Sequence, residues 1–337
     1  MILPNALVTG DVHLRDGPYP DDIKLGTTLL TDLQDAALAS DCKYVVIAGD
    51  FFHSKNPSWD VVLMGYLGML EMKKAGLTVF WCRGNHDFAI KSRPGHTVMS
   101  LFRDVCIPVL EPYRLEDKST VAWIVPWYEG KAYRAIIQEV HRQTMSKPGK
   151  KHYLISHIGI KEGEVTENFW VNQEIGSKDL CPDLYTQVLL GDYHYAQTIG
   201  HNIHYLGPPM PLDFTTTQDA YHPWKLDWVA GALTPVPLSY RYPRYRHYTL
   251  AEGESVIPGY SDRDRNRVTV CIDRADTAKV LYPDAEILYT AKEEATLDRL
   301  EGVNETDWET TWAEYCSSKG VYETHFKPGR EFLLKAE

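Results

Sequence analysis

The sequence lacks the features that define several large classes of protein. None of its apolar runs is long enough to cross a bilayer, and residues 1–5 lack the basic and apolar pattern of a leader. The six cysteines include no C-x-x-C pair, which excludes a disulfide framework and a zinc ribbon. With a net charge of -11 the chain is no generally basic nucleic-acid binder, although a local cationic patch can still attract phosphate. We therefore expect a cytoplasmic protein with reduced, buried cysteines and no membrane association.

What is present is an alternation of strand-like and helical patterns over about the first 160 residues. A helix is expected from Asp21-Asp22 onward, and Ser58 is a plausible N-cap for a second helix that Gly76 closes. The apolar positions expected to face the core are Leu25, Leu29, Leu33 and Ala36 in the first helix, and Trp59, Val62, Leu63, Tyr66, Met69 and Leu70 in the second. This alternation predicts an α/β sandwich with helices outside the sheets.

A change in composition divides the chain after residue 235. Residues 1–235 hold the alternating pattern, which becomes rich in strands from residue 187. Residues 236–337 contain more Gly, Pro and charge, with strands expected at 267–272 and 285–289 and helices at 293–300 and 306–317. The second part is expected to be a small α+β domain.

Polar side chains follow five of the apolar runs, each where the run ends. A lone Asp in such a place is usually a turn former or helix N-cap, and a lone His is usually structural. The recurrence is the stronger signal, and it indicates one shared site. The five motifs are Asp11-Val12-His13, Gly49-Asp50-Phe51-Phe52-His53, Gly84-Asn85-His86-Asp87, Ser156-His157 and Gly191-Asp192-Tyr193-His194.

These residue types suit a pair of divalent cations. Two cations about 3.5–4 Å apart need one shared carboxylate, for which Asp50 is the natural candidate, together with terminal nitrogen and oxygen ligands. Such a pair activates water at neutral pH for in-line attack on phosphorus, without a protein nucleophile. The expected ligands are Asp11, His13, Asp50, Asn85, His157, Asp192 and His194. His53, His86 and Asp87 have no evident ligand role, which leaves them for substrate or supporting contacts.

As a set, the five motifs resemble the signature blocks of the calcineurin-like metallophosphoesterases. The Gly-Asp-Phe-Phe-His motif and the segment from Ile203 to Pro208 resemble the SbcD-type nuclease subunits of recombination complexes, with short bacteriophage versions closest in length. The resemblance covers about residues 5–215. It implies two mixed β-sheets flanked by helices, and beyond residue 235 a capping-like domain by analogy only.

The resemblance also implies a division of labour within the site. One metal would be held by Asp11, His13, Asp50 and His194, and the other by Asp50, Asn85, His157 and Asp192. His86 would protonate or stabilise the leaving oxygen, Asp87 would orient His86, and His53 would help hold the phosphate. Mn is the expected ion, with Mg, Fe or Zn as alternatives.

Two positions depart from the family pattern. Asp192 stands where the family most often has His, which makes that site harder and favours Mn or Mg. Arg15 stands where a Gly commonly follows the first block, and its side chain could either touch a phosphate or face solvent.

The implied function is that of a metal-dependent DNA nuclease, exonucleolytic from 3' to 5' or endonucleolytic, working with a separate SbcC-like coiled-coil ATPase. Arg241, Arg244 and Arg246 alternate with tyrosines, as contacts to nucleic acid would, although an ordinary strand with solvated arginines has the same pattern. The alternatives are a small-molecule phosphodiesterase or phosphatase, and a scaffold subunit whose second metal site has decayed at Asp192. Homodimer formation is left open, and a phage-encoded protein would act in the host cytoplasm.

Overall fold

The computed structural model describes residues 2–87, 97–166, 169–215, 221–250, 254, 256–271 and 274–290. The chain divides into two compact units, Met1–Arg246 with Ser261–Arg265, and the rest of the chain. The domain boundary after residue 235 stays a prediction, while the first compact unit continues to Arg246.

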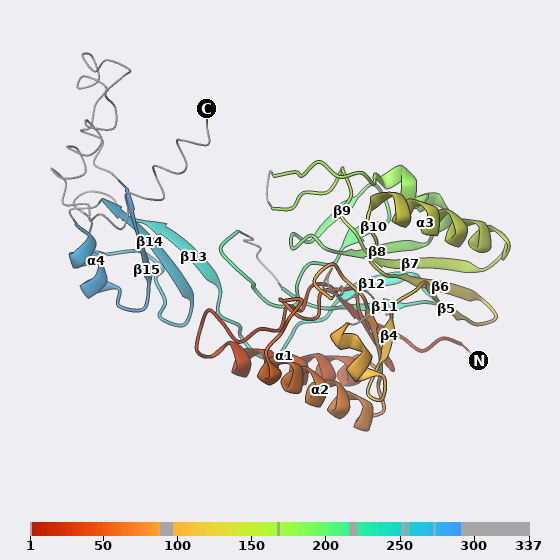
Figure 1. The fold of residues 1–337 in the computed structure, drawn as a ribbon, viewed down its shortest axis with the longest axis horizontal. Coiled ribbons are helices and arrows are strands. Elements are labelled where there is room, and N and C mark those ends of the chain that lie inside the picture. The colour runs from red at the N-terminus through yellow and green to blue at the C-terminus, as the bar shows by residue number, and fades with distance from the viewer. Residues whose placement is uncertain are drawn as a thin grey trace, which may run out of the picture. The chain divides into compact units, whose positions relative to one another are not determined.

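The first unit contains two six-stranded sheets (Figure 1). The first sheet has the order β12-β11-β1-β2-β3-β4, in which β1 to β4 are parallel and β11 and β12 are antiparallel additions. Its strands are β1 Ala6–Thr9, β2 Tyr44–Ile47, β3 Thr78–Cys82, β4 Ile107–Val109, β11 Trp224–Asp227 and β12 Ala232–Pro235.

The second sheet has the order β5-β6-β7-β8-β10-β9, with β6, β7, β8 and β10 parallel and an antiparallel strand at each edge. Its strands are β5 Tyr113–Glu116, β6 Thr120–Val125, β7 Lys151–His157, β8 Gln187–Gly191, β9 Gln197–Ile199 and β10 Ile203–Tyr205. Both sheets are therefore mixed, as expected.

Helices cover the outer face of each sheet (Figure 1). The helices α1 Asp22–Ala39 and α2 Trp59–Lys74 pack on the first sheet, and α3 Gly130–Met145 packs on the second. Alternate residues of one strand point to opposite layers. In β2, Val45 and Ile47 face the α1 and α2 helices, whereas Val46 packs between the two sheets against strands such as β7. This is the four-layer α/β sandwich that the sequence predicts. Short 3-10 turns lie at Val98–Phe102, Ser177–Leu180 and Pro182–Leu184.

The second unit has one three-stranded sheet in the order β13-β14-β15, with β14 and β15 parallel. Its elements are β13 Tyr245–Thr249, β14 Arg265–Cys271, α4 Ala275–Leu281 and β15 Glu286–Thr290, of which Tyr245, Arg246 and Arg265 still belong to the first unit. The strands expected at 267–272 and 285–289 correspond to β14 and β15, whereas α4 was not expected. The helices expected at 293–300 and 306–317 lie outside the described residues.

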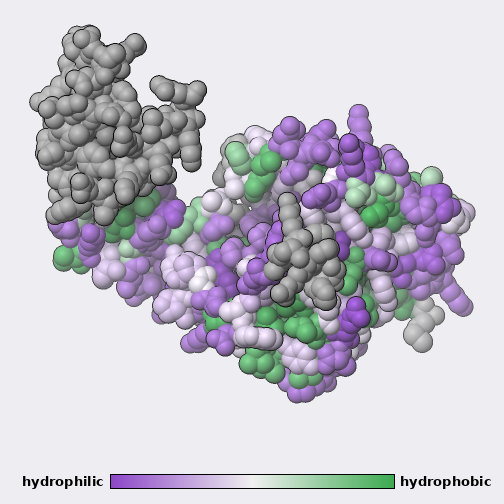
Figure 2. Space-filling view, in the orientation of Figure 1, coloured by the Kyte–Doolittle hydropathy of each residue, from purple (hydrophilic) through white to green (hydrophobic). Residues whose placement is uncertain are grey.

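The expected buried face of α2 is partly wrong. Ser58 caps the helix as predicted, since its hydroxyl accepts a hydrogen bond from the Val61 N–H at 3.4 Å. However, Trp59 and Leu63 are 79% and 54% exposed, and Figure 2 shows hydrophobic residues on the surface over α1 and α2. The helix turns Gly65 inward, where a Cβ would come within 2.8 Å of Phe51. Close approach of the backbone to Phe51 thus decides the orientation, rather than the burial of the largest side chains.

Other expectations concern cysteines and membranes. Cys42, Cys82 and Cys106 are buried thiols, Cys181 and Cys271 are partly exposed thiols, and Cys316 lies outside the described residues. Among the helices in the described part of the chain, none combines the length and apolarity that a bilayer span requires.

Candidate metal centre

The candidate site lies where parallel strands end. The loops after β1, β2 and β3 open at one edge of the first sheet, and those after β7 and β8 at one edge of the second. The His13 N–H donates to the Asp50 carbonyl at 3.0 Å, which joins the first two loops. The Asp192 N–H donates to the Asp11 carboxylate at 3.1 Å, which joins the two sheets. Five motifs from distant parts of the sequence thus meet at one place.

Four of the expected ligands extend from left-handed backbone. Six described non-glycine residues have positive φ, and these include Asp11 at 31°, His13 at 50°, Asp50 at 47° and Asp192 at 100°. Asp and His adopt this conformation more readily than most residues, but it still costs free energy. The surrounding hydrogen bonds must therefore hold these residues in place, as is typical of functional sites.

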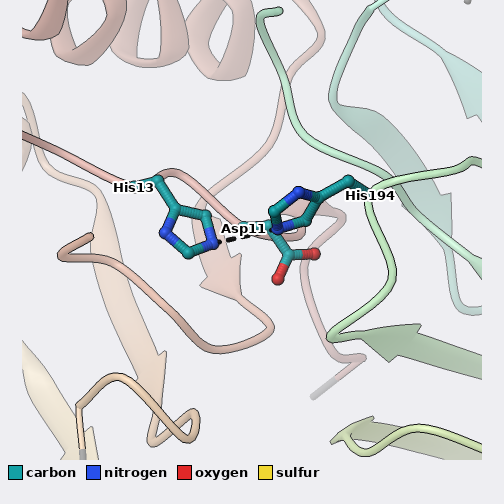
Figure 3. A group of neighbouring side chains, drawn as sticks. All are labelled: Asp11, His13 and His194. Atoms are coloured by element: carbon teal, nitrogen blue, oxygen red, sulfur yellow. Dashed lines mark hydrogen bonds between the residues drawn. The ribbon is translucent and has the colours of Figure 1, made fainter. Parts of the chain in front are cut away.

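One group of donors consists of Asp11, His13, Asp50 and His194. A ligand atom from each of Asp11, His13 and His194 lies within 4.8 Å of the others, and Figure 3 shows the two imidazoles turned toward each other beside Asp11. The His13 Nε2 atom is 3.1 Å from His194 Nε2 and 3.7 Å from Asp50 Oδ2. Two ring nitrogens this close need either a proton or a cation between their lone pairs.

A second group of donors surrounds His157. Its Nε2 atom is 3.0 Å from Asn85 Oδ1, 3.5 Å from Asp50 Oδ1 and 3.5 Å from Asp192 Oδ1. Its Nδ1 atom is 2.8 Å from the Ala48 carbonyl, which can only accept a hydrogen bond. Nδ1 therefore carries a proton, and Nε2 is the ring atom available as a ligand.

Asp50 belongs to both groups through different oxygens. Its Oδ2 faces His13 and its Oδ1 faces His157. The Oδ1 atom also accepts a hydrogen bond from the His86 N–H at 2.9 Å, which fixes the rotation of the carboxylate. A carboxylate in this orientation can be shared between two cations.

Burial makes this collection of charges costly unless it is neutralised. Asp11, Asp50 and His157 are 0%, 3% and 0% exposed. Burial raises the pKa of Asp11 well above its usual value. Burial also opposes ionisation of Asp50, but His157 and the other nearby imidazoles outweigh it and hold the pKa of Asp50 low. Burial likewise disfavours charged His157, yet the surrounding carboxylates raise its pKa well above the usual value.

The donors fit divalent cations. Buried carboxylates are stable when paired or when they coordinate metals, and here the partners are imidazoles, which are themselves metal ligands. Carboxylate oxygen, amide oxygen and imidazole nitrogen suit Mn, Mg, Fe or Zn and do not select sharply among them. The chain thus provides two overlapping sets of donors for such ions.

His53 and His86 lie at the rim of the site. The His53 Nδ1 atom is 3.3 Å from His13 Nδ1, and His86 Nδ1 contacts the His53 carbonyl. His86 is 36% exposed at its side chain, with Nε2 3.9 Å from Asp50 Oδ2. Together with His13 and Asp50 it forms a further group that could hold an ion, a role the sequence did not suggest.

Asp87 has a different position from the one expected. Its buried carboxylate accepts hydrogen bonds from Trp81 Nε1 at 3.0 Å and from the Gly84 N–H at 2.9 Å, and among the described residues it makes no hydrogen bond to His86. Burial, with the charge of Asp50, raises the pKa of Asp87 to about 6. Asp87 therefore shapes the loop that carries Asn85 and does not orient the imidazole directly.

The expected substrate-binding arginines occupy two places. The Arg15 side chain is 13% exposed, so the alternative that it faces solvent is wrong. Arg241 and Arg246 are 63% and 45% exposed and lie 3.6 Å and 3.9 Å from the carboxylate of Asp264, to which Arg244 donates through its backbone N–H. Arg241 and Arg244 also line a cleft of about 380 Å³ with tyrosines and prolines. Asp264 thus offsets part of the positive charge that the sequence suggested.

Two contributors were missed from the sequence. Asp213, in the proline-rich segment after β10, raises the pKa of both His53 and His194, against the larger effect of burial. Asp213 is not spaced from another Asp or His in the way that metal ligands are, so nothing in the sequence signalled its proximity to the site. Gly49 has φ of +97°, and a Cβ there would lie 2.0 Å from His157 Nδ1. A Gly before a ligand could have indicated such a close approach.

A comparison with protein families agrees with this fold. The family model described as "Calcineurin-like phosphoesterase" matches residues 4–229. The crystal structure of Pseudomonas putida nuclease MPE is similar at 19% sequence identity and a TM-score of 0.28. That alignment covers 47% of this chain and 64% of the other, so this chain spans less than two thirds of the length of that protein. A likeness this distant says nothing about substrate.

Gly49→Ala tests whether the close approach at His157 builds the second group of donors. The added Cβ would push His157 away from the Ala48 carbonyl, so we expect loss of one of two bound Mn ions in a metal-stoichiometry measurement. Gly76→Ala is the matched control, because Gly76 also has positive φ but a Cβ there would meet nothing within 4 Å. It should lose about 1–2 kcal/mol of stability, the cost of a left-handed backbone at a non-glycine residue, and keep both ions. Full metal binding by folded Gly49→Ala would contradict the assignment.

Proposed function

The chain belongs to the calcineurin-like phosphoesterase family, and on that basis we propose that it is a dinuclear-metal phosphodiesterase that acts on DNA as a nuclease subunit. The family hydrolyses phosphoesters. The single observation that supports a two-metal enzyme is Asp50, whose two oxygens face two different groups of ligands.

The residues of this chain would divide the work as follows. One ion would be held by Asp11, His13, Asp50 and His194, and the other by Asp50, Asn85, His157 and Asp192. Bound divalent ions supply Lewis-acid neutralisation of the phosphate and a more acidic water. The Ala48 carbonyl keeps His157 in the tautomer that presents Nε2, and the Asp192 N–H holds the Asp11 carboxylate in place.

His86 is the candidate for proton transfer to the leaving oxygen. Its side chain is 36% exposed, and its ring is held by contact with the His53 carbonyl. His53 is close enough to His13 to help position a phosphate beside the first group of ligands. Both can act on substrate without being required as ligands, because each ion already has four donors in the scheme above.

DNA is the proposed substrate because of the motifs that resemble SbcD-type nucleases and because of the surface around Tyr240. Arg241 and Arg246 are exposed beside tyrosines, and side chains of this kind contact backbone phosphates and stack on bases. The proposal includes a separately encoded SbcC-like ATPase as partner and Mn as the ion. Both rest on resemblance.

His86→Ala should separate metal binding from chemistry. We expect both ions to stay bound while turnover falls by roughly 10²–10⁴, the usual effect of losing a general acid. His201→Ala is the control, because the His201 side chain is 69% exposed and, within the part of the chain that the structure describes, its one ion pair is with surface Asp183. Loss of an ion from His86→Ala would instead make His86 a ligand, and unchanged turnover would remove it from the mechanism.

Cleavage of end-labelled DNA tests the substrate. With Mn, and with or without a candidate ATPase, wild-type protein should degrade duplex or single-stranded DNA, and Asp50→Ala purified in parallel should not. The same preparations are assayed on a p-nitrophenyl phosphodiester. Hydrolysis of the small diester with intact DNA under every condition would favour the small-molecule alternative. No hydrolysis of either, with no bound metal, would favour a scaffold.

A further inference from the structure

Arg15 follows the ligand His13 by two residues, and its side chain connects several segments. Its guanidinium donates to the Leu212 carbonyl at 2.8 Å and to the Tyr245 hydroxyl at 2.6 Å. Its Nε atom lies 3.4 Å from the Asp22 carboxylate at the start of α1. A mostly buried guanidinium is costly unless its donors are paired, so these contacts hold the loop after His13 in one position.

Arg265 makes a parallel set of contacts with the same loop. Its guanidinium lies 4.0 Å from the Tyr19 ring centroid, pairs with Asp21 and lies 3.7 Å from Asp22. The Tyr245 and Tyr19 rings are 6.1 Å apart, edge to face. We call Arg15, Tyr19, Asp22, Tyr245 and Arg265 the Arg15 cluster.

The Arg15 cluster lies where the chain leaves the first compact unit. Tyr245 is the first residue of β13 and Arg265 the first residue of β14, and both belong to the first unit, whereas their strands continue into the second. The Arg265 N–H donates to the Arg244 carbonyl at 2.7 Å, so the segments that begin β13 and β14 are hydrogen-bonded to each other. The loop that bears His13 is thus attached to Tyr245 and Arg265, both within the first unit.

The other side of the same loop is attached to the loop of Asp50. The Leu14 N–H donates to the Phe51 carbonyl at 2.9 Å, and the Leu14 carbonyl accepts from the His53 N–H at 3.0 Å. His13 itself has a φ of 50°, a strained conformation that persists only when its surroundings enforce it. The Asp50 loop and the Arg15 cluster supply that restraint from opposite sides.

We propose that Arg15 is a positioning residue for the metal group that contains His13, acting through its bond to Tyr245. The inference rests on the proposed metal centre. It predicts that the affinity of that group for its ion depends on the Tyr245 hydroxyl. The affinity of the group around His157 should not depend on it. Loss of the hydrogen bond between Arg15 and Tyr245 would then weaken binding of one ion selectively.

Tyr245→Phe removes the hydroxyl and leaves the ring. Mn titration of wild-type protein should give two steps, and the step that His194→Ala abolishes identifies the group containing His13. In Tyr245→Phe the Mn affinity of this step should fall about tenfold, which is the lower end of the range for loss of a contact that supports a metal ligand. The Mn affinity of the other step should be unchanged. Arg15→Lys, which keeps the charge but loses the forked geometry, should weaken the same step.

Tyr248→Phe is the matched control. Its hydroxyl donates to the Gly259 carbonyl at 3.2 Å, outside the Arg15 cluster, so both Mn steps should match wild type. Circular dichroism melts verify folding of each variant. Unchanged steps in folded Tyr245→Phe, or equal weakening in Tyr248→Phe, would overturn the role of Arg15 while leaving the metal centre intact. A wild-type chain that takes up no Mn would overturn both.

Discussion

The rest of the site depends on Asp50 facing two groups of buried donors at once. One oxygen faces His13 and the other faces His157, and the carboxylate is almost completely excluded from water. In such surroundings a charge must be compensated nearby, and imidazoles can do this only partly. The fold therefore places Asp50 where two cations would relieve the electrostatic cost, and this requirement explains why ligands from both sheets meet there.

The backbone bears part of the cost of this arrangement. Asp11, His13, Asp50 and Asp192 all have positive φ, and hydrogen bonds between loops hold them. Gly49 also helps, because the His157 ring fills the space that a side chain at position 49 would need. Parallel strands supply a rigid frame, and the strained residues are confined to the loops at their ends.

The sequence predicted the sandwich and its strands because short continuous apolar runs bounded by turn residues are local signals. It identified the ligand motifs because they recur at strand ends. It could not give the buried face of α2, since the approach of Gly65 to Phe51 depends on tertiary packing. It could not place Asp87 or Arg15 either, because their partners Trp81 and Tyr245 are set by the fold. The contribution of Asp213 is likewise a matter of spatial proximity.

The most direct test of a shared Asp50 is electron paramagnetic resonance of the Mn-loaded wild-type protein. Two ions held by one carboxylate should give the spectrum of a magnetically coupled Mn pair at two equivalents of metal. Asp50→Asn, which keeps the shape but removes the charge, should lose the coupling. A wild-type spectrum of isolated Mn only, at any metal loading, would contradict the account.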